Sequence, residues 1–206
     1  MKNSDWEKVE ILGPSDIGDV VSVLSDSFFD YPVMRFVLGA EGEYQPRLTL
    51  LIRFFVMARV LRDEVLLGVS GPRGLRAAGL VSYPRGGPSP PELGGIREET
   101  WARLGDEARS RYERFGATTA RFVVESDHIH LGMIGVRSSE QGQGLGRRVL
   151  EAVHELSSSD SSSTGVTLTT ELESNVPLYE HFGYEILGCE RVGSALTTWG
   201  MYRSDR

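Results

Sequence analysis

The sequence predicts an α/β domain with a mixed sheet, and three observations support this prediction. Short runs rich in β-branched and aliphatic residues alternate with longer segments whose apolar residues recur every three or four positions. Strands and helices that alternate along a chain normally form a sheet with helices packed on it. The length of 206 residues without an internal repeat fits one domain. With 40% hydrophobic and 25% charged residues, the composition is that of a folded globular chain.

The elements of the first half follow from local patterns. Strands are predicted over residues 9–12, 64–69 and 76–83, and helices over about 15–28, 45–62 and 98–122. The first helix follows Ser15 and Asp16, which are good capping residues. A Gly-Pro-Arg-Gly turn at 71–74 joins the second and third strands. Residues 84–93 contain four prolines and two glycines, so they predict a loop.

The second half repeats the alternation. Strands are predicted over residues 128–136, 166–170, 185–189 and 196–202, and helices from 145 to about 156 and over about 176–182. The longer helix is indicated by Leu145, Val149 and Val153, which step along one face. The run 157–163 consists of six serines and Asp160, and we expect it to be a mobile surface loop.

Charge and composition exclude several classes of protein. The formal net charge of −7 argues against general nucleic-acid binding, which needs clustered Lys and Arg. A single cysteine, Cys189, excludes an internal disulfide framework and a multi-cysteine zinc site, and we expect it to lie in the core. The N-terminus lacks a signal peptide, and the most apolar stretch, 48–61, is interrupted by Arg53 and Arg59. We therefore expect a reduced, cytoplasmic protein with no membrane partner.

The most informative segment lies directly after the strand predicted at 128–136. Gly142, Gly144 and Gly146 occupy every second position, and a helix begins at once. Glycines allow a ligand to approach the backbone amides, and a helix start offers unpaired N–H groups at the positive end of its dipole. This combination binds phosphate or pyrophosphate, and Arg147 adds positive charge. An unliganded tight turn is the alternative. Neither the P-loop nor the dinucleotide fingerprint matches this glycine spacing.

Two segments of this half resemble a known family. The pattern V-x-x-x-x-Q-x-x-G-x-G over 136–146 resembles the acyl-coenzyme A loop of the GNAT superfamily of N-acetyltransferases. The run N-V-P-L-Y-E-H-F-G-Y over 175–184 is similar to its N…Y-x-x-x-G-F segment. Upstream, S-F-F-D-Y-P at 27–32 and, near the end, W-G-M-Y-R at 199–203 are similar to the puromycin N-acetyltransferase-like group.

The resemblance covers most of the chain, in the expected order, and it has three departures. Ser138 replaces a frequent proline, and Tyr184 replaces a phenylalanine. The strand before Asn175 reads T-T-E over 169–171 instead of ending in Glu-Thr or Glu-Ser. This last departure leaves open whether a carboxylate base lies on that strand.

The resemblance implies a single GNAT-type domain spanning 1–206. Its mixed twisted sheet of about six to seven strands would have helices on both faces and be splayed between the fourth and fifth strands. Residues 1–125, with a helical insertion at 85–125, would mainly bind the acceptor, and 126–206 would bind acetyl-CoA. The implied activity moves an acetyl group from acetyl-CoA to a primary amine of a small molecule by direct attack, without a metal. A homodimer is allowed for.

Two other functions stay open beside this one. One is a non-catalytic acyl-CoA-binding or regulatory domain of the same family, which keeps the loop and has lost turnover. The other is a protein or peptide N-acetyltransferase, which would need an open acidic groove for a basic peptide.

The resemblance also assigns site residues. Coenzyme binding is expected from Ile134, Gly135, Val136, Gln141, Gly142, Gln143, Gly144, Leu145, Gly146, Arg147 and Asn175. The backbone of 134–136 would pair with the pantetheine arm as an added strand does. Asn175 would bind pantetheine or cap the following helix. Tyr179 is the candidate general acid, with a half-buried structural aromatic as the alternative.

The acceptor side is less defined by sequence. Asp30 and Tyr31 are candidate acceptor-binding residues, a cation attractor and a stacking partner, or else they form only a helix-terminal turn. The general base is left open among Glu125, Asp127, His128, His130, Glu171 and Glu173. His128 and His130 share one strand face, but without cysteines or a third histidine nearby we interpret them as polar side chains rather than metal ligands.

Overall fold

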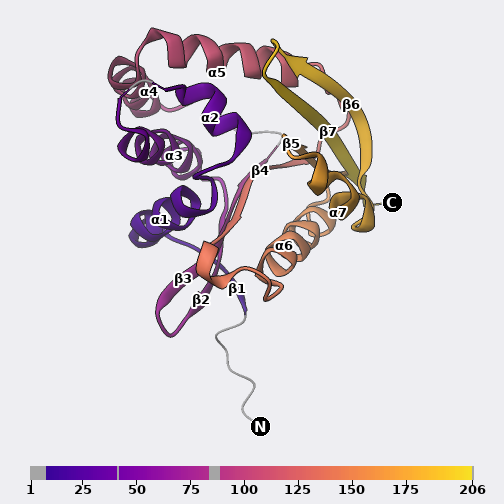
Figure 1. Ribbon diagram of the computed structural model, residues 1–206. Coiled ribbons are helices and arrows are strands. Elements are labelled where there is room, and N and C mark those ends of the chain that lie inside the picture. Colours follow the sequence, from indigo (N-terminus) through magenta and orange to yellow (C-terminus); the bar gives the residue numbers. More distant parts are fainter. Residues whose placement is uncertain (1–7, 41, 84–88, 206) are drawn as a thin grey trace.

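The computed structural model describes residues 8–40, 42–83 and 89–205, and its centre is a seven-stranded mixed sheet (Figure 1). The strands are β1 (Val9–Ile11), β2 (Leu66–Gly71), β3 (Gly74–Ser82), β4 (Ile129–Val136), β5 (Gly165–Thr170), β6 (Glu185–Val192) and β7 (Leu196–Ser204). Their spatial order is β1-β2-β3-β4-β5-β7-β6. Only the β4–β5 pair is parallel among these neighbours. The predicted α/β class and mixed sheet are confirmed.

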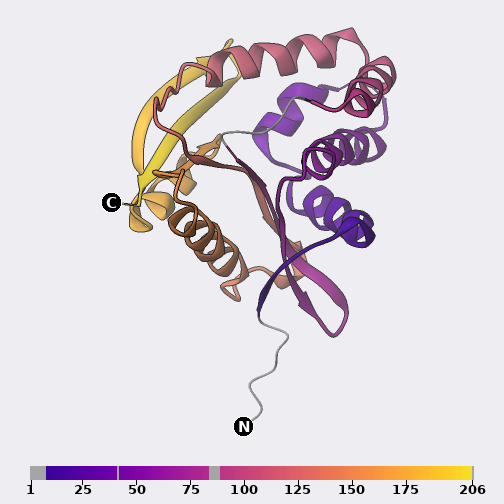
Figure 2. The same ribbon diagram turned by 180° about the vertical axis from the view of Figure 1, so that it is seen from behind.

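Helices cover both faces of this sheet. They are α1 (Ile17–Ser27), α2 (Pro32–Leu38), α3 (Tyr44–Val60), α4 (Pro91–Leu104), α5 (Asp106–Thr119), α6 (Leu145–Ser159) and α7 (Val176–His181). Figures 1 and 2 show α1 to α5 gathered on one side and α6 on the other. Each side has its own core, because α1 and α3 bury aliphatic side chains such as Leu24 and Leu51, whereas α6 buries Val149 and Val153. The apolar faces predicted for these helices are therefore the faces that pack.

The sheet opens between β4 and β5. These strands pair only over Ile129–Leu131 and Val166–Leu168. Beyond that point β4 continues along β3, and β5 continues along β7. The edge of β4 over residues 132–136 is therefore not paired with β5, as the predicted splay between the fourth and fifth strands requires. This opening positions the candidate site.

Two helix predictions are corrected by the structure. Helix α2 was not predicted, because no element was assigned between the helices expected at about 15–28 and 45–62. Pro32 occupies its first position, where proline is favourable. The predicted helix over 98–122 is two helices, α4 and α5, separated at Gly105, whose φ is 88°. Helix α4 also begins earlier, at Pro91, so the end of the predicted 84–93 loop is helical; residues 84–88 of that loop lie outside the described residues.

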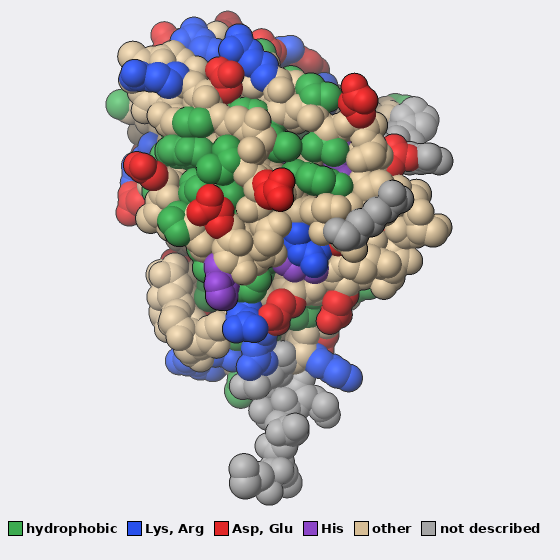
Figure 3. Space-filling view, turned by 90° about the vertical axis from the view of Figure 1, so that its right-hand side faces the viewer, with side chains coloured by type: hydrophobic (Ala, Val, Ile, Leu, Met, Phe, Trp, Pro, Cys, Tyr) green, Lys and Arg blue, Asp and Glu red, His purple; other side chains and the backbone are tan. Residues whose placement is uncertain are grey.

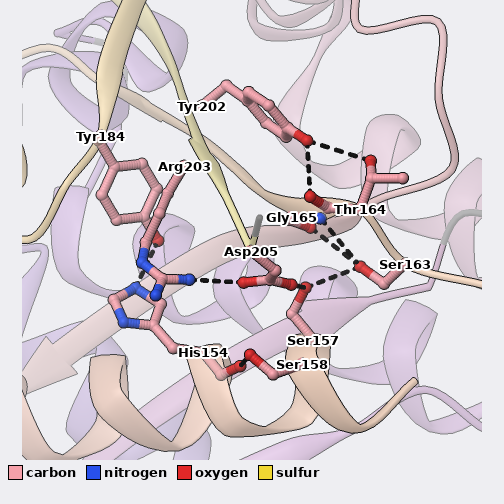
Figure 4. Close-up of polar contacts among 10 residues, drawn as sticks. All are labelled: His154, Ser157, Ser158, Ser163, Thr164, Gly165, Tyr184, Tyr202, Arg203 and Asp205. Carbon is pink, nitrogen blue, oxygen red and sulfur yellow. Dashed lines mark hydrogen bonds and ion pairs between the residues drawn. The ribbon is translucent and has the colours of Figure 1, made fainter. Parts of the chain in front are cut away.

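The serine run does not form the mobile loop that we expected. Helix α6 extends into it, and Ser157 is fully buried. Figure 4 shows Ser157 between Asp205, which follows β7, and Ser163, which lies in the turn after α6. The Ser157 hydroxyl group donates to Asp205 and hydrogen-bonds Ser163 at 2.7 Å. Asp205 also pairs with Arg203. These contacts fasten the C-terminal strand to α6 and give Ser157 and Ser163 a structural role.

The edge of the sheet that β6 forms carries an exposed apolar face. Figure 3 views the molecule from the side of β6, β7 and α7 and shows hydrophobic side chains gathered there. Leu178, Ile186 and Leu187 are 52%, 46% and 38% exposed. Cys189 on β6 is exposed as well, so its predicted place in the core is wrong. The reason is that β6 is the edge strand of the sheet that the described residues form. Within the described residues, no helix is both long and apolar enough to cross a membrane.

Candidate active site

A cavity of about 520 Å³ lies where β4 and β5 diverge. Its walls come from the α1–α2 connection, α2, α3, α5, β4, the end of β5 and α7. Seven residues that the sequence singled out line it, namely Tyr31, His128, His130, Ile134, Glu171, Asn175 and Tyr179. The fold thus brings together side chains from four predicted segments that are up to about 150 residues apart in the sequence.

The glycine loop lies beside this opening, at the start of α6. Gly142 and Gly144 have φ angles of 77° and 76°, in the left-handed region that favours glycine. A Cβ atom built at either residue would meet nothing within 4 Å, so open space lies in front of the loop. Helix α6 begins directly afterwards at Leu145, and the N–H groups of its first turn have no acceptor within the helix. The loop therefore has the shape and polarity of an anion cradle.

An ion-pair network that sequence analysis missed holds the loop in place. Arg76 of β3 donates to Glu140 Oε2 at 2.8 Å and to the side-chain oxygen of Gln143 at 2.5 Å. Gln143 in turn donates to Glu140 at 3.1 Å. Hydrogen bonding to the Arg76 guanidinium lowers the pKa of Glu140, so this carboxylate stays charged at neutral pH. The side chain of Gln143, a predicted coenzyme contact, thus supports the loop from within.

The other polar loop side chains point to solvent. Gln141 is exposed. Arg147 is 65% exposed, forms an ion pair with Glu151 at 2.7 Å and lies over the ring of Phe182 at 5.9 Å. In this structure its guanidinium therefore lies beside Glu151, one turn along α6, and near Phe182.

The unpaired edge of β4 has a second role in packing. Ile134 lines the cavity, as expected. Gly135 is buried against α1, and a Cβ atom there would lie 2.9 Å from Cβ of Ser27. The Ser27 hydroxyl accepts the N–H of Val136 at 3.3 Å. Glycine at 135 is thus needed for the close approach of α1 to the strand, whatever the edge binds.

Asn175 and Tyr179 enter the cavity from the segment around α7. Asn175 occupies the N-cap position of α7, as the capping alternative requires, but its side chain donates to Oγ1 of Thr170 at 3.2 Å and makes no capping hydrogen bond. Tyr179 is only 8% exposed, and its ring contacts Tyr184 edge-on at 5.6 Å. Burial, together with the nearby negative charge of Glu171, raises the pKa of Tyr179 to about 12, so it carries its proton at neutral pH.

Glu171 is the buried carboxylate of this site. Glu171 directly follows the last residue of β5, and its Oε1 accepts the Thr198 hydroxyl at 2.8 Å. Its backbone N–H donates to the Tyr31 hydroxyl at 3.2 Å. Burial raises the pKa of Glu171 to about 7, although the hydrogen bond from Thr198 opposes the shift.

The remaining base candidates divide into two groups. Glu125 and Glu173 are exposed and, like Asp127, do not line the cavity. His128 and His130 do line it. His128 contacts the carbonyl of Ser126, and His130 contacts the Thr167 hydroxyl at 3.0 Å. Burial, followed by the charge of Arg59, lowers the pKa of His130 to about 4. In the described parts of the chain, no cluster of three or more His, Cys, Asp or Glu side chains is arranged for a metal.

Of the two predicted acceptor residues, the structure brings one to the cavity. The Tyr31 ring lines it, and its hydroxyl hydrogen-bonds Oγ1 of Thr170 at 3.1 Å. Asp30 lies outside the cavity with a side chain that is 83% exposed, and it pairs with Arg35 at 2.6 Å. The acidic group that faces the cavity is therefore Glu171, and the sequence could not rank it above five other candidates.

The far wall of the cavity is aromatic. Phe55 of α3 stacks on Tyr112 of α5 at 5.8 Å, and Phe115 follows on the same helix. Arg59 lies at the end of this wall, where its guanidinium pairs with Glu64 at 3.4 Å. This half of the cavity can accommodate an apolar group and exclude water from the polar half.

Comparisons with known proteins agree with this architecture. Residues 112–203 match the family model described as the acetyltransferase (GNAT) domain. The chain is similar to an uncharacterized N-acetyltransferase of Schizosaccharomyces pombe, with 28% identity over 183 residues that cover 82% of this chain and 70% of that protein.

Solved structures with similar folds cover nearly the whole chain. The fold resembles a structure described as histone acetyltransferase HPA2 and related acetyltransferase from Corynebacterium glutamicum, with a TM-score of 0.66, 19% identity and coverage of 96% and 95% of the two chains. It also resembles polyamine N-acetyltransferase of Drosophila melanogaster, with a TM-score of 0.63, 15% identity and coverage of 95% and 98%. For arylalkylamine N-acetyltransferase 2 of Aedes aegypti these values are 0.62, 17%, 97% and 99%. Together with the family model, these matches show a fold of the GNAT acetyltransferase type.

Proposed function

We propose that this protein is an N-acetyltransferase that moves an acetyl group from acetyl-CoA to a primary amine of a small molecule. The observation that supports it most directly is the convergence of Asn175, Tyr179 and Glu171 on one cavity, at the point where the edge of β4 becomes free. An anion cradle at the start of α6 lies beside the same opening. An acetyl thioester with a long diphosphate arm matches this combination of cradle, free strand edge and buried polar residues.

The chain's own groups fit the parts of this coenzyme, which supplies the activated acetyl thioester when bound. The N–H groups of residues 145–147 and the guanidinium of Arg147 would bind the diphosphate. The backbone of 134–136 would hydrogen-bond the pantetheine arm by strand addition. Asn175 would hold the inner end of that arm, since its side chain lines the cavity rather than capping α7.

Tyr179 would supply the proton that the leaving thiolate needs. A thiol with a pKa of about 8.5 leaves more easily when its sulfur is protonated, and a phenol in contact with the sulfur can donate that proton. At neutral pH the acid must carry its proton, and burial ensures this for Tyr179. Direct attack also requires a neutral amine nitrogen. Only about 1% of an alkyl ammonium with a pKa near 9 is neutral at pH 7, so most acceptor molecules must lose a proton first.

The size and lining of the cavity favour a small acceptor over a protein. Its aromatic wall and its volume of about 520 Å³ suit a single small molecule, whereas a peptide substrate would need an open acidic groove. Two of the structural neighbours are named for polyamine and arylalkylamine acetylation, which supports the same class. The neighbour described as a histone acetyltransferase keeps protein acetylation as the second candidate. The similarity of segments 27–32 and 199–203 to the puromycin group makes puromycin a reasonable first acceptor to test.

Release of free thiol from acetyl-CoA tests the proposal. The purified protein should release thiol with at least one member of a panel of small amines that includes puromycin, and mass spectrometry should show the acetylated amine. Absence of turnover with the whole panel, despite tight acetyl-CoA binding, would support the non-catalytic alternative. Turnover only with a basic peptide would favour protein acetylation.

Replacing Tyr179 tests its role. Tyr179→Phe should lower kcat on the order of 10²-fold, because general acid catalysis contributes at least that much, while acetyl-CoA affinity stays within about twofold. Tyr202→Phe is the matched control, since its hydroxyl donates to the carbonyl of Thr164 away from the cavity. An unchanged kcat in Tyr179→Phe would remove Tyr179 from the mechanism.

A further inference from the structure

The cavity contains one carboxylate among the described residues that line it, and this group is Glu171. Its carboxylate accepts the Thr198 hydroxyl, whereas no Lys, Arg or His in the described parts of the chain forms an ion pair with it. A buried carboxylate is costly unless a cation accompanies it or a proton neutralises it. The site is therefore built to receive a positive charge or a proton from whatever enters the cavity.

The elements around Glu171 hold its side chain in one position. Thr198 of β7 is fully buried, so its hydroxyl is a fixed donor. The backbone N–H of Glu171 is held by the Tyr31 hydroxyl, which also contacts Thr170. Three separate segments, the α1–α2 connection, β5 and β7, thus converge on this residue. A surface carboxylate has no such support, which sets Glu171 apart from Glu125 and Glu173.

We propose that Glu171 is the catalytic base, which binds the ammonium group of the acceptor and removes its proton before attack. This inference rests on the proposed acetyltransferase function. The first proton of the ammonium moves to the Glu171 carboxylate, which leaves a neutral nitrogen with a free electron pair. The nitrogen forms the new C–N bond to the acetyl carbon while the C–S bond breaks, and the sulfur takes the proton of Tyr179. The second proton of the nitrogen restores Tyr179, and Glu171 releases its proton to solvent with the product.

The charges in the cavity make these two proton transfers support each other. The negative charge of Glu171 is one of the causes that raise the pKa of Tyr179. When Glu171 takes the proton of the acceptor, this charge disappears, and Tyr179 becomes a stronger acid at the moment when the thiolate leaves. Proton transfer to Glu171 therefore also makes Tyr179 a better proton donor.

Tyr31, Tyr179 and His130, which also face this region, are poorer bases, and His128 uses Nδ1 for a contact with the Ser126 carbonyl at 2.7 Å. Tyr31 and Tyr179 both have a raised pKa and stay protonated across the neutral range. His130 is neutral there, but its pKa of about 4 makes it a weak proton acceptor, and one ring nitrogen already contacts Thr167. Arg59 carries a fixed positive charge on the far wall and pairs with Glu64. Glu171, with a pKa of about 7, is matched to accept a proton near neutral pH.

The test replaces Glu171 by its isosteric amide and measures the pH dependence of kcat/KM. Glu171→Gln keeps an oxygen that can accept the Thr198 hydroxyl and should fold, which thermal unfolding and acetyl-CoA affinity will verify. At neutral pH we expect kcat/KM for an alkyl amine to fall on the order of 10²-fold or more. Glu173→Gln, an exposed carboxylate two residues away, is the matched control and should behave as wild type. Glu171→Asp should recover part of the lost activity.

The pH profile separates a catalytic from a structural role. In the wild type, kcat/KM should rise with pH and level off above about pH 7, where Glu171 is ionised, well below the amine pKa of about 9. In Glu171→Gln it should keep rising toward the amine pKa, because only the free amine then reacts. If both profiles have the same shape, or if Glu171→Gln retains full activity, Glu171 is not the base, although the proposed function stands. If the wild type acetylates no amine at all, the proposed function fails first, and the assignment of Glu171 fails with it.

Discussion

The burial of Glu171 has a consequence for stability that can be measured without a substrate. Its pKa of about 7 in the folded protein exceeds the ordinary value of 4.5, so the folded state binds this proton more tightly than the unfolded state. Below about pH 4.5 Glu171 is protonated in both the folded and the unfolded state, so its burial carries no ionisation cost. As the pH rises toward about 7, the unfolded state ionises first, and the unfolding free energy falls. A shift of this size corresponds to about 3 kcal/mol of unfolding free energy.

Glu171→Gln removes this titration while keeping the shape of the side chain. Urea unfolding of wild type and variant at several pH values gives the difference in unfolding free energy. This difference should change by about 3 kcal/mol between about pH 4.5 and pH 8, with the wild type relatively less stable at the higher pH. Buried histidines titrate equally in both proteins, so the difference isolates Glu171. A difference that does not vary with pH would show that Glu171 ionises as an exposed carboxylate does, and the reasoning on the base would fail with it.

Two further substitutions test the loop and the C-terminal contacts. Gly144→Val places a β-branched residue at a φ of 76°, so it should raise the dissociation constant of acetyl-CoA at least about tenfold in calorimetric titration, whereas unchanged affinity would contradict the cradle. Ser157→Ala removes the buried hydroxyl that donates to Asp205, which keeps its ion pair with Arg203, and should cost about 1–3 kcal/mol of unfolding free energy with no change in coenzyme affinity. A loss below about 0.5 kcal/mol would mean that these contacts do not fasten β7 to α6.

The regular elements could be predicted from the sequence because their apolar patterns are local. The run Leu145, Val149 and Val153 forms the buried face of α6, as its spacing indicates. The effect of individual prolines and glycines on helix boundaries was harder to predict. Pro32 begins a helix that was not predicted, and Gly105 divides one predicted helix into two. In both cases the local residue allows either outcome, and packing against the rest of the fold selects one.

Buried polar side chains were the larger obstacle. Ser157 is in a run that is typical of a solvated loop, yet its partner Asp205 lies 48 residues further along the chain. The anchor of the glycine loop joins Arg76 to Glu140 across 64 residues. No local sequence pattern indicates such pairs, because a charged or hydroxyl side chain is normally exposed. A long-range partner becomes visible only when the strands are in register.

The candidate site divides in the same way. The glycine loop, Asn175 and Tyr179 could be proposed from sequence, because their spacing along the chain matches a family motif, although their roles stay predictions until they are measured. The acceptor side has no such spacing. Asp30 looked suitable but points to solvent, whereas Glu171 was one of six candidates until the fold buried it beside Thr198. Burial, which gives this carboxylate its chemistry, is a property of the assembled fold.

A crystal structure of the protein with acetyl-CoA bound is the most direct measurement. The diphosphate should contact the backbone N–H groups of residues 145–147, the pantetheine arm should run along the free edge of β4, and the thioester should lie between Tyr179 and Glu171. A coenzyme bound elsewhere, or a loop that stays covered by protein side chains, would contradict this account.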